Sequence, residues 1–96
     1  MVRNGIMNKS KVFVYILKCA DDTLYIGSTN DLEKRLHAHN NLRTGAKYTR
    51  GRRPVKLVYR EECKDYAEVR KREGELKRLS RADKLDLIKM NSVINS

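Results

Sequence analysis

The sequence predicts an α+β fold, in which a small antiparallel three-stranded sheet is flanked by helices in the order β-β-α-β-α-α. Short runs of β-branched and aromatic residues predict the strands, and segments that begin with capping residues predict the helices. The length of 96 residues suffices for one hydrophobic core but not for two. We therefore expect one domain over residues 11–90, a flexible leader over 1–10 and a C-terminal tail over 91–96.

Two apolar runs that flank an acidic turn predict the first strand pair. Residues 12–17 are all aliphatic or aromatic, in a run too short for a typical helix, which indicates a strand buried on both faces. Asp21 and Asp22 signal a turn, and residues 23–28 resume the strand pattern until Gly27 interrupts it. A hairpin is therefore expected at the start of the domain.

The register of this hairpin decides where two tyrosines point. If Asp21 and Asp22 alone form the loop, Tyr15 pairs with Ser28, and Tyr15 and Tyr25 project from opposite faces of the sheet. Only an odd-length loop or a bulge brings both phenols to one face.

Helix-start signals predict three helices. Asn30 can cap the first with Glu33 three positions on, and this helix is expected to end near Asn40, with Leu32 and Leu36 on its inner face. The same signals recur twice, as Asp65 with Glu68 for a second helix to about Leu79, and as Ser80 with Asp83 for a short third helix that carries Leu85, Leu87 and Ile88.

A basic loop and a third strand separate the first two helices. Residues 44–54 hold two glycines, the only proline and four positive charges, and this composition sustains neither the helix nor the strand period. After this loop, the residues of the third strand alternate, with Val55, Leu57 and Tyr59 on one side and Lys56, Val58 and Arg60 on the other.

The charge of the chain favours a polyanionic partner. Lysine and arginine number 22 against 12 aspartates and glutamates, which gives a formal charge of +10 on a small body. Nucleic acid is the first candidate. An anionic membrane is disfavoured, because a membrane-bound amphipathic helix needs bulky apolar residues and the chain has no tryptophan and one phenylalanine.

Cysteine usage and hydropathy favour an intracellular protein. Cys19 and Cys63 lie far apart in the sequence and lack the spacing of a structural zinc site, so we expect reduced thiols. No apolar run is long enough to span a membrane, and the N-terminus lacks the pattern of a secretory signal.

An ordered set of motifs resembles the GIY-YIG nucleases. Phe13-Val14-Tyr15 is followed by Tyr25-Ile26-Gly27 and then by a predicted helix that carries Arg35. Residues 45–51 and 76–81, Gly-Ala-Lys-Tyr-Thr-Arg-Gly and Leu-Lys-Arg-Leu-Ser-Arg, are similar to the small stand-alone, single-domain branch of this family. The resemblance spans about residues 11–89. It implies the GIY-YIG fold and a metal-dependent DNA endonuclease, for which DNA repair or recombination is one expected setting.

The resemblance assigns catalytic roles to four residues that precede the basic loop. Tyr15 and Tyr25 would converge on the scissile phosphate, one activating the attacking water and the other fixing the phosphate, and either can be the base. Arg35 would stabilise the charge of the transition state, for which a planar guanidinium is suited. His39, one helical turn after Arg35, falls where the family keeps a tyrosine or a histidine, and can assist proton transfer or bind a phosphate.

Glu73 is the expected catalytic carboxylate and metal ligand. It interrupts an inner stripe formed by Tyr66, Val69, Leu76 and Ser80, and a carboxylate there needs an arginine, a metal ion or an opening to solvent. The resemblance places the family's metal-binding glutamate at this position. A single Mg²⁺ or Mn²⁺ ion is implied, since magnesium needs few protein ligands when a substrate phosphate contributes the others.

Cationic and aromatic residues form the expected nucleic-acid contacts, because phosphates attract cations and bases stack on aromatic rings. These residues are Lys47, Tyr48, Arg50, Arg52, Arg53 and Lys77.

Several alternatives remain open at the level of the sequence. The runner-up to a nuclease is a non-catalytic nucleic-acid-binding module with the same fold, because Ser28 stands where several relatives have a lysine. DNA, whether branched or otherwise structured, is favoured over RNA by the resemblance alone. So small a domain leaves room for a protein partner or a homodimer that supplies targeting.

Overall fold

The computed structural model describes residues 11–42 and 46–95, so the predicted leader lies outside the described residues. The elements are β1 (Val12–Lys18), β2 (Leu24–Thr29), α2 (Leu32–Asn41), α3 (Lys47–Arg50), β3 (Lys56–Cys63), α4 (Tyr66–Arg78) and α5 (Arg81–Asn95). The predicted fold class is therefore confirmed. Two details differ. A helical turn, α3, lies within the predicted basic loop, and α5 continues beyond the predicted short helix to Asn95.

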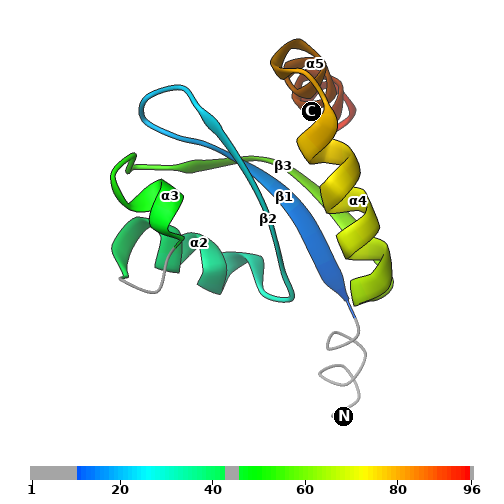
Figure 1. Cartoon of the computed structure of the whole chain (residues 1–96), viewed down its shortest axis with the longest axis horizontal. Helices are drawn as coiled ribbons and strands as arrows, with labels where there is room; N and C mark the ends of the chain where they lie inside the picture. The colour runs from blue at the N-terminus through cyan, green and yellow to red at the C-terminus, as the bar shows by residue number, and fades with distance from the viewer. Residues whose placement is uncertain (1–10, 43–45, 96) are drawn as a thin grey trace.

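The three strands form one antiparallel sheet in the order β2-β1-β3. The most apolar strand, β1, lies in the centre, where both of its faces are covered by protein (Figure 1). This position explains why its residues are apolar without alternation, since each face of the strand packs into a core of its own.

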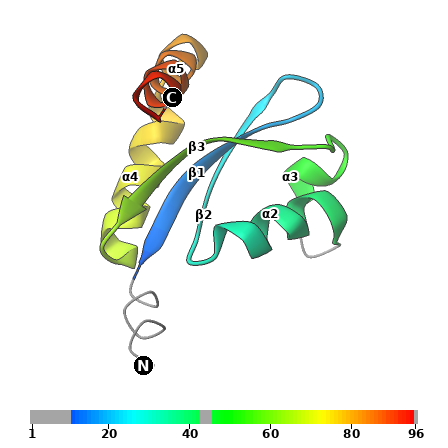
Figure 2. The same ribbon diagram turned by 180° about the vertical axis from the view of Figure 1, so that it is seen from behind.

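The sheet lies between two hydrophobic clusters, where the length predicts a single core, because the apolar central strand packs on both of its faces. Helices α4 and α5 cover one face, where Val69 and Leu76 pack with Val12, Val14 and Ile16. Helices α2 and α3 lie beyond the other face (Figure 2). That face holds a second core of the buried residues Tyr15, Leu17, Cys19 and Val55, against which Leu32 and Leu36 of α2 pack as predicted.

The hairpin has an odd-length loop, as convergence of the tyrosines requires. Lys18 pairs with Leu24 and Leu17 pairs with Tyr25, so five residues connect the strands. Asp22 in this loop has a φ of 71°, in the left-handed region that aspartate tolerates better than most residues. Tyr15 pairs with Gly27 rather than with Ser28, and the two tyrosines therefore share the face covered by α2.

The alternation expected in the third strand is interrupted by a bulge. Ile16 pairs with Tyr59 and Leu17 pairs with Leu57, which leaves Val58 as the extra residue. Leu57 packs in the core under α2, whereas Tyr59 packs in the core under α4. The prediction that Val55, Leu57 and Tyr59 point the same way is therefore wrong for Tyr59.

The helix caps agree with the sequence in two of three cases. Asp65 accepts a hydrogen bond from the backbone N–H of Glu68 at the start of α4, and Ser80 accepts one from Asp83 at the start of α5. At the start of α2, however, the cap is Asp31, which accepts from Lys34, rather than Asn30. None of the helices in the described ranges is long and apolar enough to cross a membrane.

Candidate active site

A chain of three hydrogen bonds, two of them buried and the third partly buried, begins at the central strand. The phenol of Tyr15, a residue only 1% exposed, lies 2.8 Å from Nε2 of His39. Nδ1 of His39 lies 2.8 Å from the hydroxyl of Thr49, which donates to the carbonyl of Ala46 at 2.9 Å. Because the Thr49 proton is used in this way, Thr49 accepts from Nδ1–H, and Nε2 of a neutral His39 accepts from Tyr15. These hydrogen bonds therefore fix both the tautomer of the His39 imidazole and the direction of the Tyr15 phenolic proton.

Gly27 makes room for the Tyr15 ring. A Cβ atom on Gly27 would lie 2.5 Å from the phenolic oxygen and 2.7 Å from Cζ of Tyr15, well inside van der Waals contact. A glycine is therefore required at position 27, because the phenol ring of Tyr15, its cross-strand partner, occupies the space that a side chain would fill.

Burial sets the protonation states of this pair. Desolvation raises the pKa of Tyr15 to about 12, and a hydrogen bond from Arg35 opposes this rise. Desolvation also lowers the pKa of His39 to about 4, with further lowering by the positive charges of Arg35 and Arg53. At neutral pH the site therefore holds a protonated phenol and a neutral imidazole.

Tyr25 brings a second phenol to the same place. Its ring centroid lies 6.4 Å from that of Tyr15, 5.2 Å from that of His39 and 5.7 Å from that of Tyr48. Unlike Tyr15, Tyr25 is partly exposed. The aromatic cluster thus has a buried member bonded to His39 and a member that solvent can reach.

Glu73 approaches this cluster from the other face of the sheet. It lies on α4, which packs against β1 and the edge strand β2. Its side chain is 21% exposed and forms an ion pair with Lys77, one turn on, at 3.0 Å. Its negative charge contributes to the raised pKa of Tyr15, after desolvation of the phenol.

The donor set suits one kind of metal ion. Within residues 11–42 and 46–95 no three histidine, cysteine, aspartate or glutamate side chains gather closely enough to enclose an ion. A lone, partly exposed carboxylate matches magnesium or manganese, which keep water ligands and share substrate phosphates, and not zinc, which needs several protein ligands.

All the residues of this site lie within a segment that matches a known family. Residues 11–86 match the family model of the GIY-YIG catalytic domain. The chain belongs to the GIY-YIG family. This places it in a family of nuclease domains.

Several of the relatives that match are named UPF0213 proteins. One from Syntrophus aciditrophicus is 56% identical over 82 residues, which cover 85% of this chain and 94% of the relative. One from Clostridium perfringens is 57% identical over 81 residues, covering 84% of this chain and 86% of the relative. The solution NMR structure of a UPF0213 protein from Bacillus halodurans is 40% identical, with a TM-score of 0.54 over 83% of this chain and 84% of that one. The NMR structure of an E. faecalis protein is 36% identical, with a TM-score of 0.61 over 90% of this chain and 91% of that one.

Ser28 lies on the α4 side of the sheet. Ser28 pairs with Val14, whose side chain packs under α4, and side chains of paired residues point to the same face. Ser28 thus faces the helix that carries Glu73, and Tyr15 faces the opposite way.

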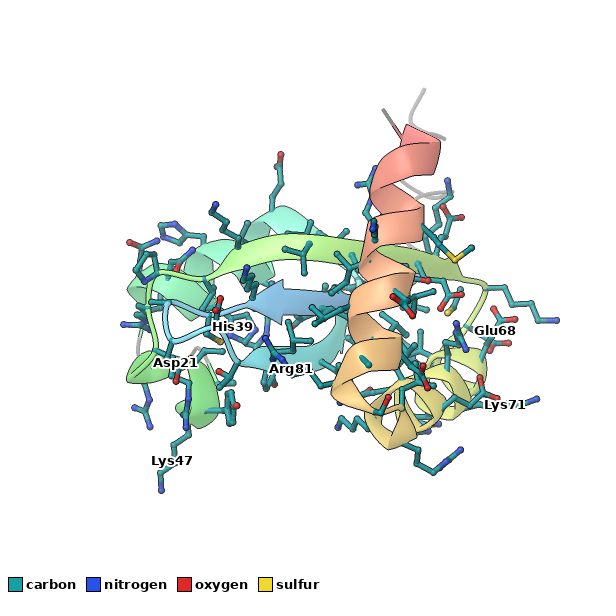
Figure 3. The ribbon with its side chains drawn as sticks, turned by 90° about the horizontal axis from the view of Figure 1, so that it is seen from above. Asp21, His39, Lys47, Glu68, Lys71 and Arg81 are labelled. Atoms are coloured by element: carbon teal, nitrogen blue, oxygen red, sulfur yellow. The ribbon has the colours of Figure 1, made fainter. Side chains whose placement is uncertain are left out.

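The basic residues expected to contact nucleic acid in this GIY-YIG domain divide into two groups. Lys47, Arg50 and Lys77 are exposed, and Figure 3 shows Lys47 pointing away from the domain. Arg53 instead donates to the carbonyl oxygens of His39 and Leu42, at the C-terminal end of α2. Arg52 donates to Asp21 and lies over the ring of Tyr48. The two arginines thus hold the site together in the free protein.

Three residues of the GIY-YIG site have a place that sequence reasoning did not give them. The sequence predicts only a loop position for Thr49, an interruption of a strand for Gly27 and a phosphate contact for Arg53. Their neighbours are distant in sequence, and no periodic pattern reports such contacts. The sequence offers one signal for Thr49. It lies among cations in the Tyr-Thr-Arg segment that resembles the stand-alone branch, and a threonine there is not explained by phosphate binding.

Proposed function

We propose that this protein is a metal-dependent DNA endonuclease that hydrolyses a phosphodiester bond by in-line attack of water. The hydrogen-bonded chain from Tyr15 through His39 to Thr49 carries the proposal. A tyrosine that fills a core has no need of a buried imidazole acceptor with a fixed tautomer, whereas a tyrosine that passes on a proton does.

Tyr15 is the proposed general base. Its own proton already points at Nε2 of His39, so its lone pairs are available to a second donor. As water attacks, its proton moves to the Tyr15 oxygen and the Tyr15 proton moves to Nε2. The water oxygen forms a bond to phosphorus while the opposite phosphorus–oxygen bond breaks, and the leaving oxygen takes a proton from solvent.

The low pKa of His39 in the free protein does not prevent this transfer. Arg35 and Arg53 contribute to that low pKa through their positive charges, after desolvation. A bound phosphodiester places negative charge beside these cations and makes the imidazolium form of His39 more favourable. The tyrosine's proton therefore has an acceptor when substrate is present.

Arg35 and Tyr25 act on the phosphate in this proposal. Arg35 hydrogen-bonds to Tyr15 in the free protein, and its guanidinium is suited to the charge that develops on the phosphoryl oxygens. Tyr15 is covered in the free protein, so the attacking water enters as Arg35 shifts toward the phosphate. Tyr25, the phenol that solvent reaches, binds a phosphate oxygen.

Glu73 is the residue that would hold Mg²⁺ or Mn²⁺. A divalent ion bound there supplies Lewis-acid stabilisation of charge on the phosphate. The ion pair with Lys77 is exposed and weak by comparison, because a single surface pair contributes at most about 1 kcal/mol.

The test of this proposal compares wild type with Glu73→Gln in cleavage and binding assays on branched, nicked and single-stranded DNA, and on RNA, over a magnesium and manganese titration. Glu73→Gln keeps the size of the side chain and removes its charge, so we expect binding to persist and metal-dependent cleavage to be lost. Glu62→Gln is the matched control, because Glu62 is an exposed residue of β3 whose loss changes the net charge equally.

Two results count against the proposal. Equal cleavage by wild type and Glu73→Gln would remove Glu73 from the mechanism. Tight binding by wild type without cleavage of any substrate would favour a nucleic-acid-binding module.

A further inference from the structure

Arg52 joins two parts of the chain that are far apart in sequence. Its Nε donates to the carboxylate of Asp21 in the hairpin loop at 3.0 Å, and Nη1 donates to the carbonyl of Tyr48 at 2.8 Å. The guanidinium carbon lies 4.0 Å from the centre of the Tyr48 ring. Its backbone carbonyl accepts a hydrogen bond from the N–H of Ala20, also in the hairpin loop, at 2.9 Å. Arg52 thus fastens the end of α3 to the hairpin.

The helical turn that Arg52 fastens, α3, is too short to be stable by itself. Helix α3 comprises four residues, and its N-cap residue, Ala46, makes no side-chain capping bond. Isolated helices of fewer than about 12 residues are marginal in water, because the first turn fixes several residues for one hydrogen bond. The position of Thr49, which is completely buried within α3, therefore depends on tertiary contacts.

An aromatic stack leads from Arg52 back to His39. The Tyr48 ring, with the Arg52 guanidinium over it, packs at 5.7 Å against Tyr25, and Tyr25 packs at 5.2 Å against His39. Arg52 therefore reaches the imidazole by two routes, through Tyr48 to Tyr25 and through α3 to Thr49. Figure 3 shows Asp21 and His39 toward the same end of the domain.

We propose that Arg52, held by Asp21, is a positioning residue for His39 and Tyr15 and not a phosphate contact. The proposal rests on the endonuclease function proposed above. It assigns a role to Asp21, an exposed acidic residue on a basic protein, whose carboxylate would otherwise only repel DNA.

Substitution of Arg52 by lysine separates the two roles. Lysine keeps the positive charge but lacks both the planar stacking surface and the donors that a guanidinium holds apart in a fixed geometry. If Arg52 positions the site, Arg52→Lys and Arg52→Gln both lower the single-turnover rate constant at saturating enzyme, by about tenfold, while Arg52→Lys binds DNA like wild type. Arg50→Gln measures what the loss of one exposed charge on the same turn does to affinity. A partly unfolded variant lowers the amount of active enzyme and not this rate constant, so the readout is specific for positioning.

Substitution of Asp21 gives effects of opposite sign on binding and rate. Asp21→Asn removes a negative charge, so DNA binding becomes tighter, whereas the loss of its ion pair with Arg52 slows cleavage. The double variant Asp21→Asn/Arg52→Gln should be no slower than Arg52→Gln alone, since both changes break one linkage. Additive losses in rate, or an Arg52→Lys variant with the wild-type rate, would overturn the proposal and favour a phosphate contact.

A second measurement does not depend on activity. The ¹⁵N chemical shifts of the His39 ring report its tautomer, and we expect the Nδ1–H form in wild type and a mixture of tautomers in Arg52→Lys. A pure Nδ1–H form in Arg52→Lys would contradict the positioning role. If wild type cleaves no substrate, the endonuclease proposal fails, and these shifts still decide whether Arg52 positions His39.

Discussion

At the scale of single residues, Gly27 controls the position of the Tyr15 phenol. Gly27→Ala places a Cβ where the phenolic oxygen and Cζ lie, at 2.5 and 2.7 Å, so the ring must move and its hydrogen bond to His39 is lost. We expect a loss of about 1–3 kcal/mol in unfolding free energy, typical of an overpacked core. A cleavage rate at least about 100-fold lower is expected, as for other displaced catalytic groups. Denaturant unfolding and single-turnover cleavage measure the two effects.

Gly51 supplies a matched control for this substitution. No atom lies within 4 Å of a Cβ built on Gly51, whose φ of −90° suits any L-residue. Gly51→Ala should therefore change stability by less than about 1 kcal/mol. If Gly27→Ala were as mild, the close approach of Tyr15 would not constrain this position.

The buried imidazole makes stability depend on pH. The pKa of His39 is lowered to about 4 by desolvation, then by the charges of Arg35 and Arg53. An unfolded histidine, with a pKa of about 6.5, therefore binds a proton before the folded one does. The contribution of His39 to stability is present above pH 6.5 and is lost as the pH falls to about 4, up to about 3 kcal/mol at 1.4 kcal/mol for each pKa unit.

The measurement is the unfolding free energy from pH 7.5 to 4 for wild type and His39→Gln. The variant lacks the titrating group, so its curve should fall less steeply between pH 6.5 and 4. Parallel curves would contradict the lowered pKa of His39.

At the scale of elements, Arg72 fixes the orientation of α4. Its guanidinium donates to Glu61 of β3 at 2.7 Å and to Glu75 at 3.1 Å. The hydrogen bond to Glu61 is the main reason that its pKa lies above the ordinary value. Because Glu73 follows Arg72 directly, we expect this anchor to affect the direction of the proposed metal ligand as well.

Arg72→Met tests this anchor. Methionine keeps much of the aliphatic stem but leaves Glu61 and Glu75 without their cation, and we expect a loss of about 1–3 kcal/mol in unfolding free energy. Metal-dependent cleavage should fall as well, with a higher magnesium concentration needed for half-maximal rate. Arg70→Met is the control, at an exposed position of the same helix. It should change the unfolding free energy and the magnesium requirement less than Arg72→Met does.

The bulge in β3 is a second feature at this scale. It turns Leu57 toward the core under α2 and Tyr59 toward the core under α4, where the pKa of Tyr59 is raised, first by desolvation. A regular strand would place both side chains on one face. One extra residue thus lets the same strand contribute side chains to the hydrophobic clusters on both faces of the sheet.

At the scale of the whole molecule, the charge of +10 provides a long-range attraction for a polyanion. Exposed cations lie at both ends of the domain, with Lys47 at the α3 end and Lys71 at the α4 end (Figure 3). Phosphate contacts release counterions, so DNA binding should weaken steeply as salt is added.

Lys47→Gln/Arg50→Gln tests whether α3 contacts DNA. If both cations contact phosphates, the slope of the logarithm of affinity against the logarithm of salt concentration should fall by about 1.8, at about 0.9 for each contact on duplex DNA. Lys64→Gln/Lys89→Gln removes the same charge from exposed positions outside α3. An unchanged slope for the α3 variant would place the contact surface elsewhere.

The sequence by itself determined the fold class, the family and the approximate bounds of the strands and helices. These properties are local or ordered along the chain: the apolar run of β1, the caps Asp65 and Ser80, and the order of tyrosines, arginine and glutamate. It also showed that Tyr15 and Tyr25 share a face only if the hairpin loop has an odd length. The loop length itself is known only from the pairing of β1 with β2, which joins residues on the two sides of the turn.

The tertiary structure alone decided what each side chain of the site touches. Thr49 orients His39 across 10 positions, Tyr15 meets His39 across 24, and Arg52 meets Asp21 across 31. Periodicity reports which face of an element is buried and not which partner lies there, because a partner is set by how elements pack. The same limit applies to Arg52 and Arg53: composition counts their charges and predicts phosphate contacts, whereas only packing shows the hydrogen bonds that the two guanidinium groups make within the free protein.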